Sequence, residues 1–335
     1  MAFDRLETLQ SPTGAHLALR HAPAEGKARA IIQINHGVSE HAQRYGRFAR
    51  FLSGRGFHVY AHDHRGHGFT RVAGIPAGRF ADRDGMAAVL GDVDAVTDLA
   101  RDRHPDLPLI LFGHSLGGLV ALNHVLGHAG KIDAAAIWNA NFSAGTLGRL
   151  AQLILRGERM FLGSDVPSML LPKLTFQEWN RGIADARTDF DWLSRDPAEV
   201  DAYIADPLCG WNPTVGMWRD IFGFVFAGAD DKLLAGVRRD LPFNLVGGAQ
   251  DPATAKGTAV KHLRRRMQRL GFTDITMKLY DDTRHEGLNE INRDIIMQDF
   301  ADWAGRVVER RTSNSDIVKP DGLSSDLPAM KGKTA

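Results

Sequence analysis

The chain has 335 residues, 44% of them hydrophobic and 24% charged, which is typical of a soluble globular protein with one large core and an inserted subdomain. Its 41 Lys and Arg residues balance 40 Asp and Glu residues, so no overall positive field exists to hold nucleic acid, and we expect no nucleic-acid partner. The single cysteine, Cys209, excludes an internal disulfide. We find neither a secretory signal nor an apolar run of the ~20 residues that a membrane span needs. We therefore expect a cytoplasmic protein.

The first 140 residues alternate between strand-like and helix-like segments. Residues 5–22 predict a hairpin that turns at Pro12-Thr13-Gly14, and the nearly continuous apolar run at 30–34 predicts a strand buried on both faces. Further strands are expected at 57–61, 109–112 and 134–138, and helices at 41–55, at 86–100 and from Leu116. Strand and helix in regular turn imply right-handed crossovers, so we predict an α/β fold with a mostly parallel sheet covered by helices on both faces.

About a hundred residues separate the strand at 134–138 from the next strand-like run, at 243–247. The intervening segment, 142–238, has helical periodicity and is rich in Trp, Phe, Pro and Arg, so we interpret it as an inserted helical cap. Within it, residues 146–163 combine many apolar side chains with Arg149, Arg156 and Arg159. That pattern fits either a helix that lies at a lipid surface or one that packs onto the core.

The sheet is expected to resume after the insertion. A strand at 243–247, a helix at 258–270, a strand around 275–279 and a final helix with Ile291, Ile295, Phe300 and Trp303 on its buried side complete the core. Residues 312–335 are rich in Ser, Asp, Lys, Pro and Gly, which predicts a disordered tail. These boundaries divide the chain into an N-terminal core part (1–141), the cap (142–238), a C-terminal core part (239–311) and the tail (312–335).

Residues 113–117, Gly-His-Ser-Leu-Gly, match the G-x-S-x-G pattern of a nucleophile elbow. They lie between the apolar strand 109–112 and a helix start rich in small residues, where a sharp turn exposes a serine at a strand end. The glycines are needed because side chains two residues before and after the serine would collide in so tight a turn. We therefore predict Ser115 as a nucleophile.

A serine hydroxyl is a weak nucleophile at neutral pH, so a histidine must take its proton and an acid must orient that histidine. Asp251 and His285 each follow a predicted strand, and they come in the order serine, acid, histidine. We predict His285 as the base and Asp251 as the acid, with Asp281 or Asp282 as alternatives for the acid.

Two backbone N–H groups are expected to stabilise the negatively charged oxygen that forms during such a reaction. They belong to Val38, which follows the first parallel strand, and to Leu116, which follows the nucleophile. His36 precedes Val38, and we interpret it as a buried, hydrogen-bonded histidine rather than a proton shuttle.

The segment 62–67, His-Asp-His-Arg-Gly-His, contains three histidines and invites comparison with zinc sites. Gly66 stands where the H-x-H-x-D-H run of metallohydrolases has Asp, so we expect no metal there, and no cofactor elsewhere. We interpret the segment as a strand-end loop whose Asp, Arg and His side chains bond one another and support the nucleophile turn.

These segments resemble the monoacylglycerol lipase and lysophospholipase branch of the α/β-hydrolases, which also contains serine-aminopeptidase-like sequences. The matching residues are His36-Gly37-x-x-Glu40-His41-x-x-Arg44-Tyr45, Asp63-His64-Arg65-Gly66-His67-Gly68, Gly113-His114-Ser115-Leu116-Gly117-Gly118, Asp251-Pro252 and His285-Glu286. The resemblance implies the α/β-hydrolase fold, hydrolysis of lipid or other hydrophobic esters through an acyl-enzyme, no cofactor, and a cap that shapes the acyl pocket.

Two positions depart from the family pattern. Thr70 stands where the family usually has Ser, and residues 138–141, Trp-Asn-Ala-Asn, replace a stretch that is commonly made of small residues ending in Pro. The second departure lies close to where the acyl chain is expected, so the preferred chain length does not carry over.

The predicted function is cleavage of carboxylic esters of monoacylglycerol-like or lysophospholipid-like substrates. An acyltransferase and a prolyl-aminopeptidase-like peptidase stay open on the same three residues, and the peptidase would need cap acids such as Glu158, Glu178 or Asp185 to hold a substrate ammonium group. The presence of all three residues argues against a non-catalytic binding protein. The expected partner is a small-molecule or lipid ester, with peripheral membrane contact through the cap, and the sequence indicates no oligomeric state.

Overall fold

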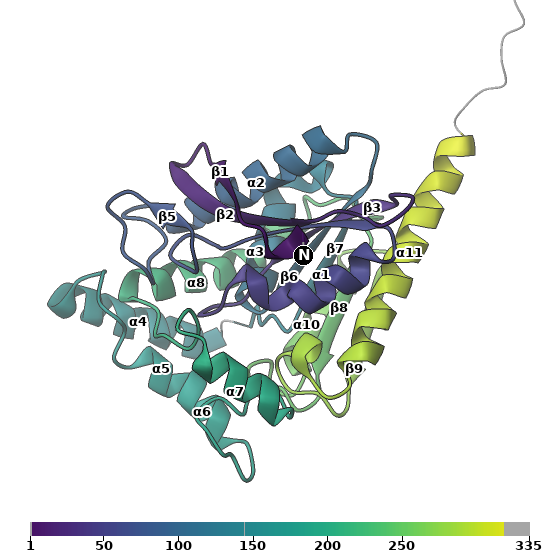
Figure 1. Cartoon of the computed structure of the whole chain (residues 1–335). Helices are drawn as coiled ribbons and strands as arrows, with labels where there is room; N and C mark the ends of the chain where they lie inside the picture. Colours follow the sequence, from purple (N-terminus) through teal and green to yellow (C-terminus); the bar gives the residue numbers. More distant parts are fainter. Residues whose placement is uncertain (1, 144, 318–335) are drawn as a thin grey trace, which may run out of the picture.

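The computed structural model describes residues 2–143 and 145–317. In this part of the chain, nine strands form one sheet in the order β1-β2-β4-β3-β6-β7-β8-β9, with β5 beside β2 (Figure 1). The strands are β1 (Glu7–Gln10), β2 (Ala15–Ala22), β3 (Ala30–Asn35), β4 (Phe57–His62), β5 (Arg71–Val72), β6 (Leu109–His114), β7 (Ala134–Trp138), β8 (Phe243–Gly248) and β9 (Ile275–Tyr280). The hairpin β1–β2 is antiparallel and β2 runs antiparallel to β4, whereas all pairs from β4 to β9 are parallel.

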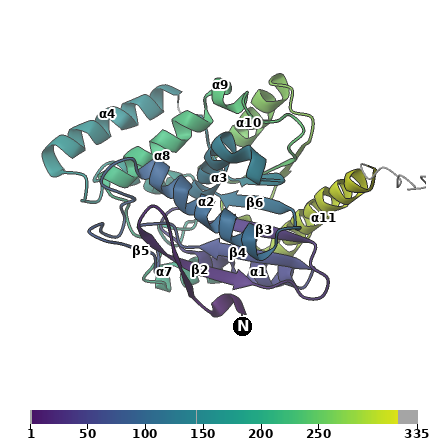
Figure 2. The same cartoon turned by 90° about the horizontal axis from the view of Figure 1, so that it is seen from above.

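Helices cover both faces of the sheet, and each face has its own apolar core (Figures 1 and 2). One core packs α1 (Gly46–Ser53) and α11 (Arg293–Ile317) against the sheet. The other contains α2 (Gly85–Arg103), α3 (Leu116–His128), α8 (Val215–Gly228) and α10 (Thr258–Arg269). Because both faces are covered, every residue of β3, β6 and β7 is buried, which explains their continuous apolar sequences.

The topology brings the strand ends that carry the predicted site residues to one edge. β3 pairs with β4 on one side and with β6 on the other, so the direction of chain progression reverses between β3 and β6. In open α/β sheets, ligands bind at the carboxyl ends of the strands beside such a reversal. Val38 follows β3, Ser115 follows β6, Asp251 follows β8 and His285 follows β9.

Six helices lie between β7 and β8 in the described chain. They are α4 (Gly145–Leu162), α5 (Leu171–Leu174), α6 (Phe176–Arg181), α7 (Pro197–Ala205), α8 and α9 (Asp231–Leu234). Not all of them form an outer layer, because α8 packs on α2 and α3 and its Met217, Ile221 and Phe224 belong to a main core. A separate small cluster of Trp192, Leu193 and Tyr203 lies under α6 and α7.

The structure corrects several details of the predicted elements. The segment 41–55 begins as a 3-10 turn, η2 (Ala42–Tyr45), before α1, and the short strand β5 was not expected. Ile291 lies before α11 and is exposed. Ile295 is also exposed, because the buried stripe of this helix runs through Ile296, Phe300 and Trp303. The helix also continues six residues beyond the predicted end of the core, since an existing helix extends over polar residues more easily than it nucleates. The remainder of the predicted tail, 318–335, lies outside the described residues.

Two further 3-10 turns, η3 (Ala129–Lys131) and η4 (Gly287–Asn289), connect elements of the core, and η1 (Ala2–Asp4) precedes β1. No helix in the described ranges has the length and apolar character needed to cross a bilayer.

Candidate active site

Ser115 occupies the sharp turn between β6 and α3. Its backbone, at φ 55° and ψ −118°, lies in a region that non-glycine residues rarely adopt and that functional sites often retain. A Cβ on Gly113 would lie 2.0 Å from the carbonyl oxygen of Gly117, and a Cβ on Gly117 would lie 1.9 Å from that of Asn35 in β3. Both glycines of the motif are therefore required by crowding, at Gly117 because β3 passes against the turn.

The three residues predicted to act together meet at the carboxyl edge of the sheet. The Ser115 hydroxyl lies 2.9 Å from Nε2 of His285, and Nδ1 of His285 lies 3.0 Å from Oδ1 of Asp251. Asp251 and His285 are buried, whereas the alternative acids Asp281 and Asp282 are exposed. The geometry thus places Asp251, rather than either of the later aspartates, in contact with His285.

Asp251 is held by donors that sequence reasoning did not identify. Its Oδ2 accepts hydrogen bonds from the side-chain amide of Asn139 (2.9 Å) and the hydroxyl of Thr254 (2.8 Å), and its Oδ1 accepts one from the Ala253 N–H (2.9 Å). Burial acts to raise the pKa of Asp251, but the charge of His285 and these donors outweigh it and lower the pKa below its usual value. Asn139 directly follows β7 at φ 48°, within the stretch that departs from the family pattern.

The two predicted oxyanion donors flank Ser115. Leu116 is the first residue of α3, so its N–H has no carbonyl one turn earlier within the helix and is free to bind a ligand. Val38 lies in the loop after β3, where the preceding N–H, that of Gly37, donates to Oε1 of Glu40 at 2.5 Å. A Cβ on Gly37 would lie 3.5 Å from Cβ of Ser115, so this loop passes directly beside the serine.

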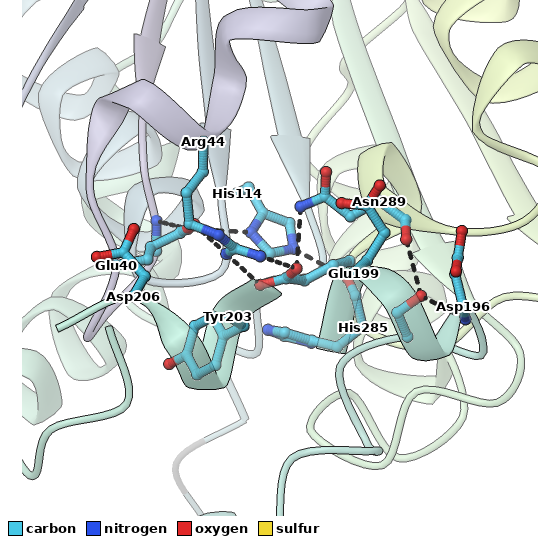
Figure 3. Close-up of polar contacts among 12 residues, drawn as sticks. Glu40, Arg44, His114, Asp196, Glu199, Tyr203, Asp206, His285 and Asn289 are labelled. Atoms are coloured by element: carbon cyan, nitrogen blue, oxygen red, sulfur yellow. Dashed lines mark hydrogen bonds and ion pairs between the residues drawn. The ribbon is translucent and has the colours of Figure 1, made fainter. Parts of the chain in front are cut away.

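A buried charged network holds the loops that carry Val38 and His285 (Figure 3). Arg44 binds Glu40 at 2.7 Å and makes two hydrogen bonds of 2.6 Å to Glu286, the residue after His285. Burial acts to lower the pKa of Arg44, but Glu286 and Glu40 raise it well above its usual value. Its guanidinium also lies over the ring of Tyr203 in α7, 4.8 Å from the centroid, so the network reaches the inserted helices.

His114 connects this network to the backbone of His285. Its Nε2–H donates to the His285 carbonyl oxygen at 2.9 Å, while Tyr45, which donates to Glu40, lies 3.3 Å from its Nδ1. Burial acts to lower the pKa of His114, but Glu40 outweighs this effect and raises it. Sequence motifs contain Glu40, Arg44 and Glu286, but they do not predict that these residues meet. The contact between Arg44 and Glu286 joins residues more than 240 positions apart.

The polar side chains of segment 62–67 were expected to bond one another, but in the described part of the chain they bind other groups or have no hydrogen-bond partner. Asp63 bonds the backbone N–H groups of Ala42 and Phe69, and Arg65 pairs with Asp92 of α2, so these side chains do not bond one another. The rings of His62 and His64 have no hydrogen-bond partner among the described residues.

His36 is buried and hydrogen-bonded, as predicted. Its Nδ1–H donates to the Gly37 carbonyl oxygen at 2.7 Å, and its Nε2 accepts from the His64 N–H at 2.9 Å. Burial lowers the pKa of His36 to about 3, so its ring is neutral at physiological pH.

Two cavities meet at Ser115. One, of about 410 Å³, is mostly apolar and extends beneath α4 and α8, with Leu119, Leu150, Ile154, Leu171, Ile221 and Val225 in its wall. The other, of about 200 Å³, is called the polar cavity here because it is less apolar than the first. Its wall combines the polar side chains of Ser39, Gln177, Asp189, Tyr203 and Asn212 with aromatic ones such as Phe190, Trp192 and Trp211. Val38, Ser115 and His285 border both, so a bond held at the serine has one side in each cavity.

Helix α4 has a buried and an exposed apolar side. Ala151 and Leu155 are buried, whereas Leu153, Met160 and Phe161 have exposed fractions of 60%, 73% and 80%. In both views α4 lies at an edge of the molecule (Figures 1 and 2). One side of α4 therefore packs onto the core, and the other presents apolar side chains at the protein surface.

Comparison with known proteins agrees with this architecture. Residues 26–292 match the family model described as serine aminopeptidase, S33. The chain is 30% identical to a monoglyceride lipase of Mus musculus over 291 residues, 84% of each chain, and 26% identical to a monoacylglycerol lipase of Mycolicibacterium smegmatis over 82% of this chain and 88% of that one.

Solved structures share the fold. A thermostable carboxyl esterase from Bacillus coagulans, in complex with glycerol, superposes with a TM-score of 0.83 at 23% identity over 92% of this chain and 99% of that one. A monoacylglycerol lipase from Paleococcus ferrophilus gives 0.65 at 20% identity over 88% and 99%. With the nucleophile turn, the strand-end histidine and acid, and a family match over most of its length, the chain belongs to the serine aminopeptidase (S33) family of α/β-hydrolases.

Proposed function

We propose that this protein is a serine hydrolase that cleaves carboxylic esters of single-chain lipids, with monoacylglycerols as the best-fitting substrates. The observation that carries the proposal is the hydrogen-bonded series Ser115–His285–Asp251 at the junction of an apolar and a polar cavity. The relatives named monoglyceride lipase and monoacylglycerol lipase support the same substrate class.

The geometry supports a two-step acyl transfer. Oγ of Ser115 attacks the ester carbonyl carbon while its proton passes to Nε2 of His285, and the N–H groups of Val38 and Leu116 bind the resulting oxyanion. Collapse of this intermediate breaks the bond to the alcohol, which leaves with the proton from His285. Water, activated by the same histidine, then attacks the acyl-enzyme, and release of the carboxylic acid regenerates Ser115. Asp251 stays ionised and orients the imidazole throughout.

The two cavities favour an uncharged alcohol over a phosphate-containing one. The acyl chain would occupy the apolar cavity, and the alcohol would occupy the smaller polar cavity. Among the described residues bordering the polar cavity, the carboxyl groups are Glu40, Asp189 and Glu286, and none is Lys or Arg. A glycerol group finds hydroxyl and amide partners there, whereas the phosphate of a lysophospholipid finds no Lys or Arg in the cavity wall, and the nearby Arg44 is already paired with Glu40 and Glu286.

The three cap acids named for the peptidase alternative do not border the two cavities at Ser115. Glu158 is buried and binds the hydroxyl of Ser168 and two backbone N–H groups, so it serves the cap's own structure. Glu178 pairs with Arg181, and Asp185 is exposed; neither borders the two cavities at Ser115.

We further propose that residues 142–238 act as a cap on a core formed by 1–141 and 239–311, and that the protein contacts membranes peripherally through α4. The exposed apolar side of α4 supports this contact, because it would be buried at a lipid surface next to the apolar cavity that Leu150 and Ile154 border.

The test is a substrate series. Monoacylglycerols and p-nitrophenyl esters of increasing chain length are compared with lysophosphatidylcholine and a proline arylamide. We expect the highest kcat/KM on monoacylglycerols and no turnover of the arylamide. Preferred cleavage of lysophosphatidylcholine would contradict the assignment of the polar cavity, and preferred cleavage of the arylamide would replace the esterase by a peptidase.

A further inference from the structure

A cavity outside the active site, of about 600 Å³, is rich in arginine. It lies between α4, α8 and the segment before α2, and its arginines are Arg79, Arg83, Arg156, Arg159 and Arg219. Arg79 is buried and pairs with Asp82 and Asp165. The other four are exposed and form no ion pair with any described residue.

The carboxylates at this cavity do not neutralise the four arginines. Asp82 is paired with Arg79, so Asp84 and Asp220 are the two carboxylates of this cavity that remain to balance the charge of four arginines. Asp220 lies against the start of α2, where a Cβ on Gly85 would be 1.9 Å from its Oδ2. Partial burial and the positive charge of Arg159 lower the pKa of Arg219, Asp220 acts to raise it, and Arg156 lowers it further. The net direction is downward, so the guanidinium groups lie close enough to repel each other in spite of Asp220. An anion between them would remove this repulsion.

The arginine cavity is next to the exposed apolar side of α4. At the ~100° turn per residue of an α-helix, Arg156 and Arg159 fall on a stripe between the buried side, with Ala151 and Leu155, and the exposed side, with Leu153 and Met160. In an amphipathic helix at a lipid surface, such flanking arginines lie at the level of the phosphates. Guanidinium groups bind phosphate through paired hydrogen bonds.

We propose that Arg83, Arg156, Arg159 and Arg219 form a binding site for the phosphate group of an anionic phospholipid in the membrane against which α4 lies. The inference rests on the proposed membrane contact of α4 and adds a headgroup preference to it. Because α4 borders both this cavity and the apolar cavity at Ser115, a phosphate bound here would orient the active site toward the bilayer.

The test compares two pairs of substitutions that remove the same charge from exposed helix positions. Arg156→Gln/Arg159→Gln changes the site, and Arg265→Gln/Arg269→Gln changes α10, which lies apart from α4 in both views and whose two arginines are exposed. Binding of the full chain is measured by co-sedimentation with phosphatidylcholine vesicles with and without phosphatidylglycerol. Each arginine near an anionic surface contributes about fivefold in affinity, so the α4 pair should weaken binding to phosphatidylglycerol vesicles about 30-fold, with little change for the α10 pair.

Three outcomes would overturn the site. An equal loss in both pairs would show general charge attraction, and unchanged binding of the α4 pair would show that these arginines do not contact lipid. Displacement of the protein from vesicles by inorganic phosphate, together with arginine-dependent binding of inorganic phosphate, would assign the site to a free anion. Hydrolysis of a soluble short-chain ester is measured beside these arms: an inactive wild-type protein would refute the proposed function, while the vesicle comparison would still decide the phosphate site.

Discussion

Replacing Asn139 by Gly removes the amide that binds Oδ2 of Asp251 without adding backbone strain, because Asn139 has φ 48° and glycine adopts that conformation freely. A hydrogen bond to a charged group contributes about 1.5–3 kcal/mol. Asp251 keeps Thr254 and Ala253 as donors, so we take the lower end of this range. If the loss falls on the transition state, kcat decreases about tenfold, since each 1.36 kcal/mol is a factor of ten.

The assay for Asn139→Gly is steady-state hydrolysis of a short p-nitrophenyl ester, with the melting temperature measured in parallel. A positioning role predicts a lower kcat with nearly unchanged KM. The matched control is Asn123→Ala, because Asn123 is also buried, its amide donates to the carbonyl oxygens of Leu119 and Phe224, and it borders neither cavity at Ser115. A wild-type kcat in Asn139→Gly, or an equal loss in Asn123→Ala, would refute the claim that Asn139 holds the acid in place.

Three further predictions concern the acid Asp251, the buried His67 and the exposed side of α4. Asp251→Asn should lower kcat ~10⁴-fold, as acid-to-amide changes do in such triads, while Asp281→Asn and Asp282→Asn stay near wild type; the reverse ranking would move the acid. Burial lowers the pKa of His67 to about 3, whereas its pKa in the unfolded chain is near ~6.5. Between these two values the unfolded chain binds a proton that the folded chain excludes. Well below pH ~6.5, the free energy of unfolding therefore falls by about 1.4 kcal/mol for each pH unit of acidification. In urea titrations at pH 7.5 and pH 5.5, about one unit each side of that value, the wild type should therefore lose about 1.4 kcal/mol more unfolding free energy on acidification than His67→Gln does, and an equal loss in the two proteins would contradict the assignment. Leu153→Ser/Phe161→Ser, which changes exposed residues outside the apolar cavity, should weaken vesicle binding at least tenfold and spare short-chain esters, whereas unchanged vesicle binding would remove α4 as the contact.

The sequence was sufficient to predict which three side chains meet, because each follows an apolar strand of a parallel sheet. Ser115, Asp251 and His285 lie 136 and 34 positions apart along the chain, yet strand ends at one sheet edge must converge. The predicted pattern of strands and helices was confirmed for the same reason, since buried strands and amphipathic helices have distinct periodicities.

The supporting contacts were not predictable from local patterns. Asn139 reaches Asp251 across 112 positions, and its role depends on a positive φ at the end of β7 that no motif marks. The ion pairs of Arg44 with Glu286 depend on how two loops meet, and the arginine cavity combines residues from three separate segments. Local periodicity also misplaced the buried stripe of α11 by one residue, because Ile295 and Ile296 are equally apolar and only the tertiary packing that buries Ile296 in the core distinguishes them.

The proposed mechanism depends most directly on Ser115 as the nucleophile, and covalent labelling tests this role. The protein is treated with a fluorophosphonate probe, and the modified peptide is identified by mass spectrometry in the wild type and in Ser115→Ala, whose fold is checked by its melting temperature. We predict a single phosphonylated peptide containing Ser115 in the wild type, and neither label nor ester hydrolysis in the folded variant. Labelling at another residue, or esterase activity retained by Ser115→Ala, would contradict the account.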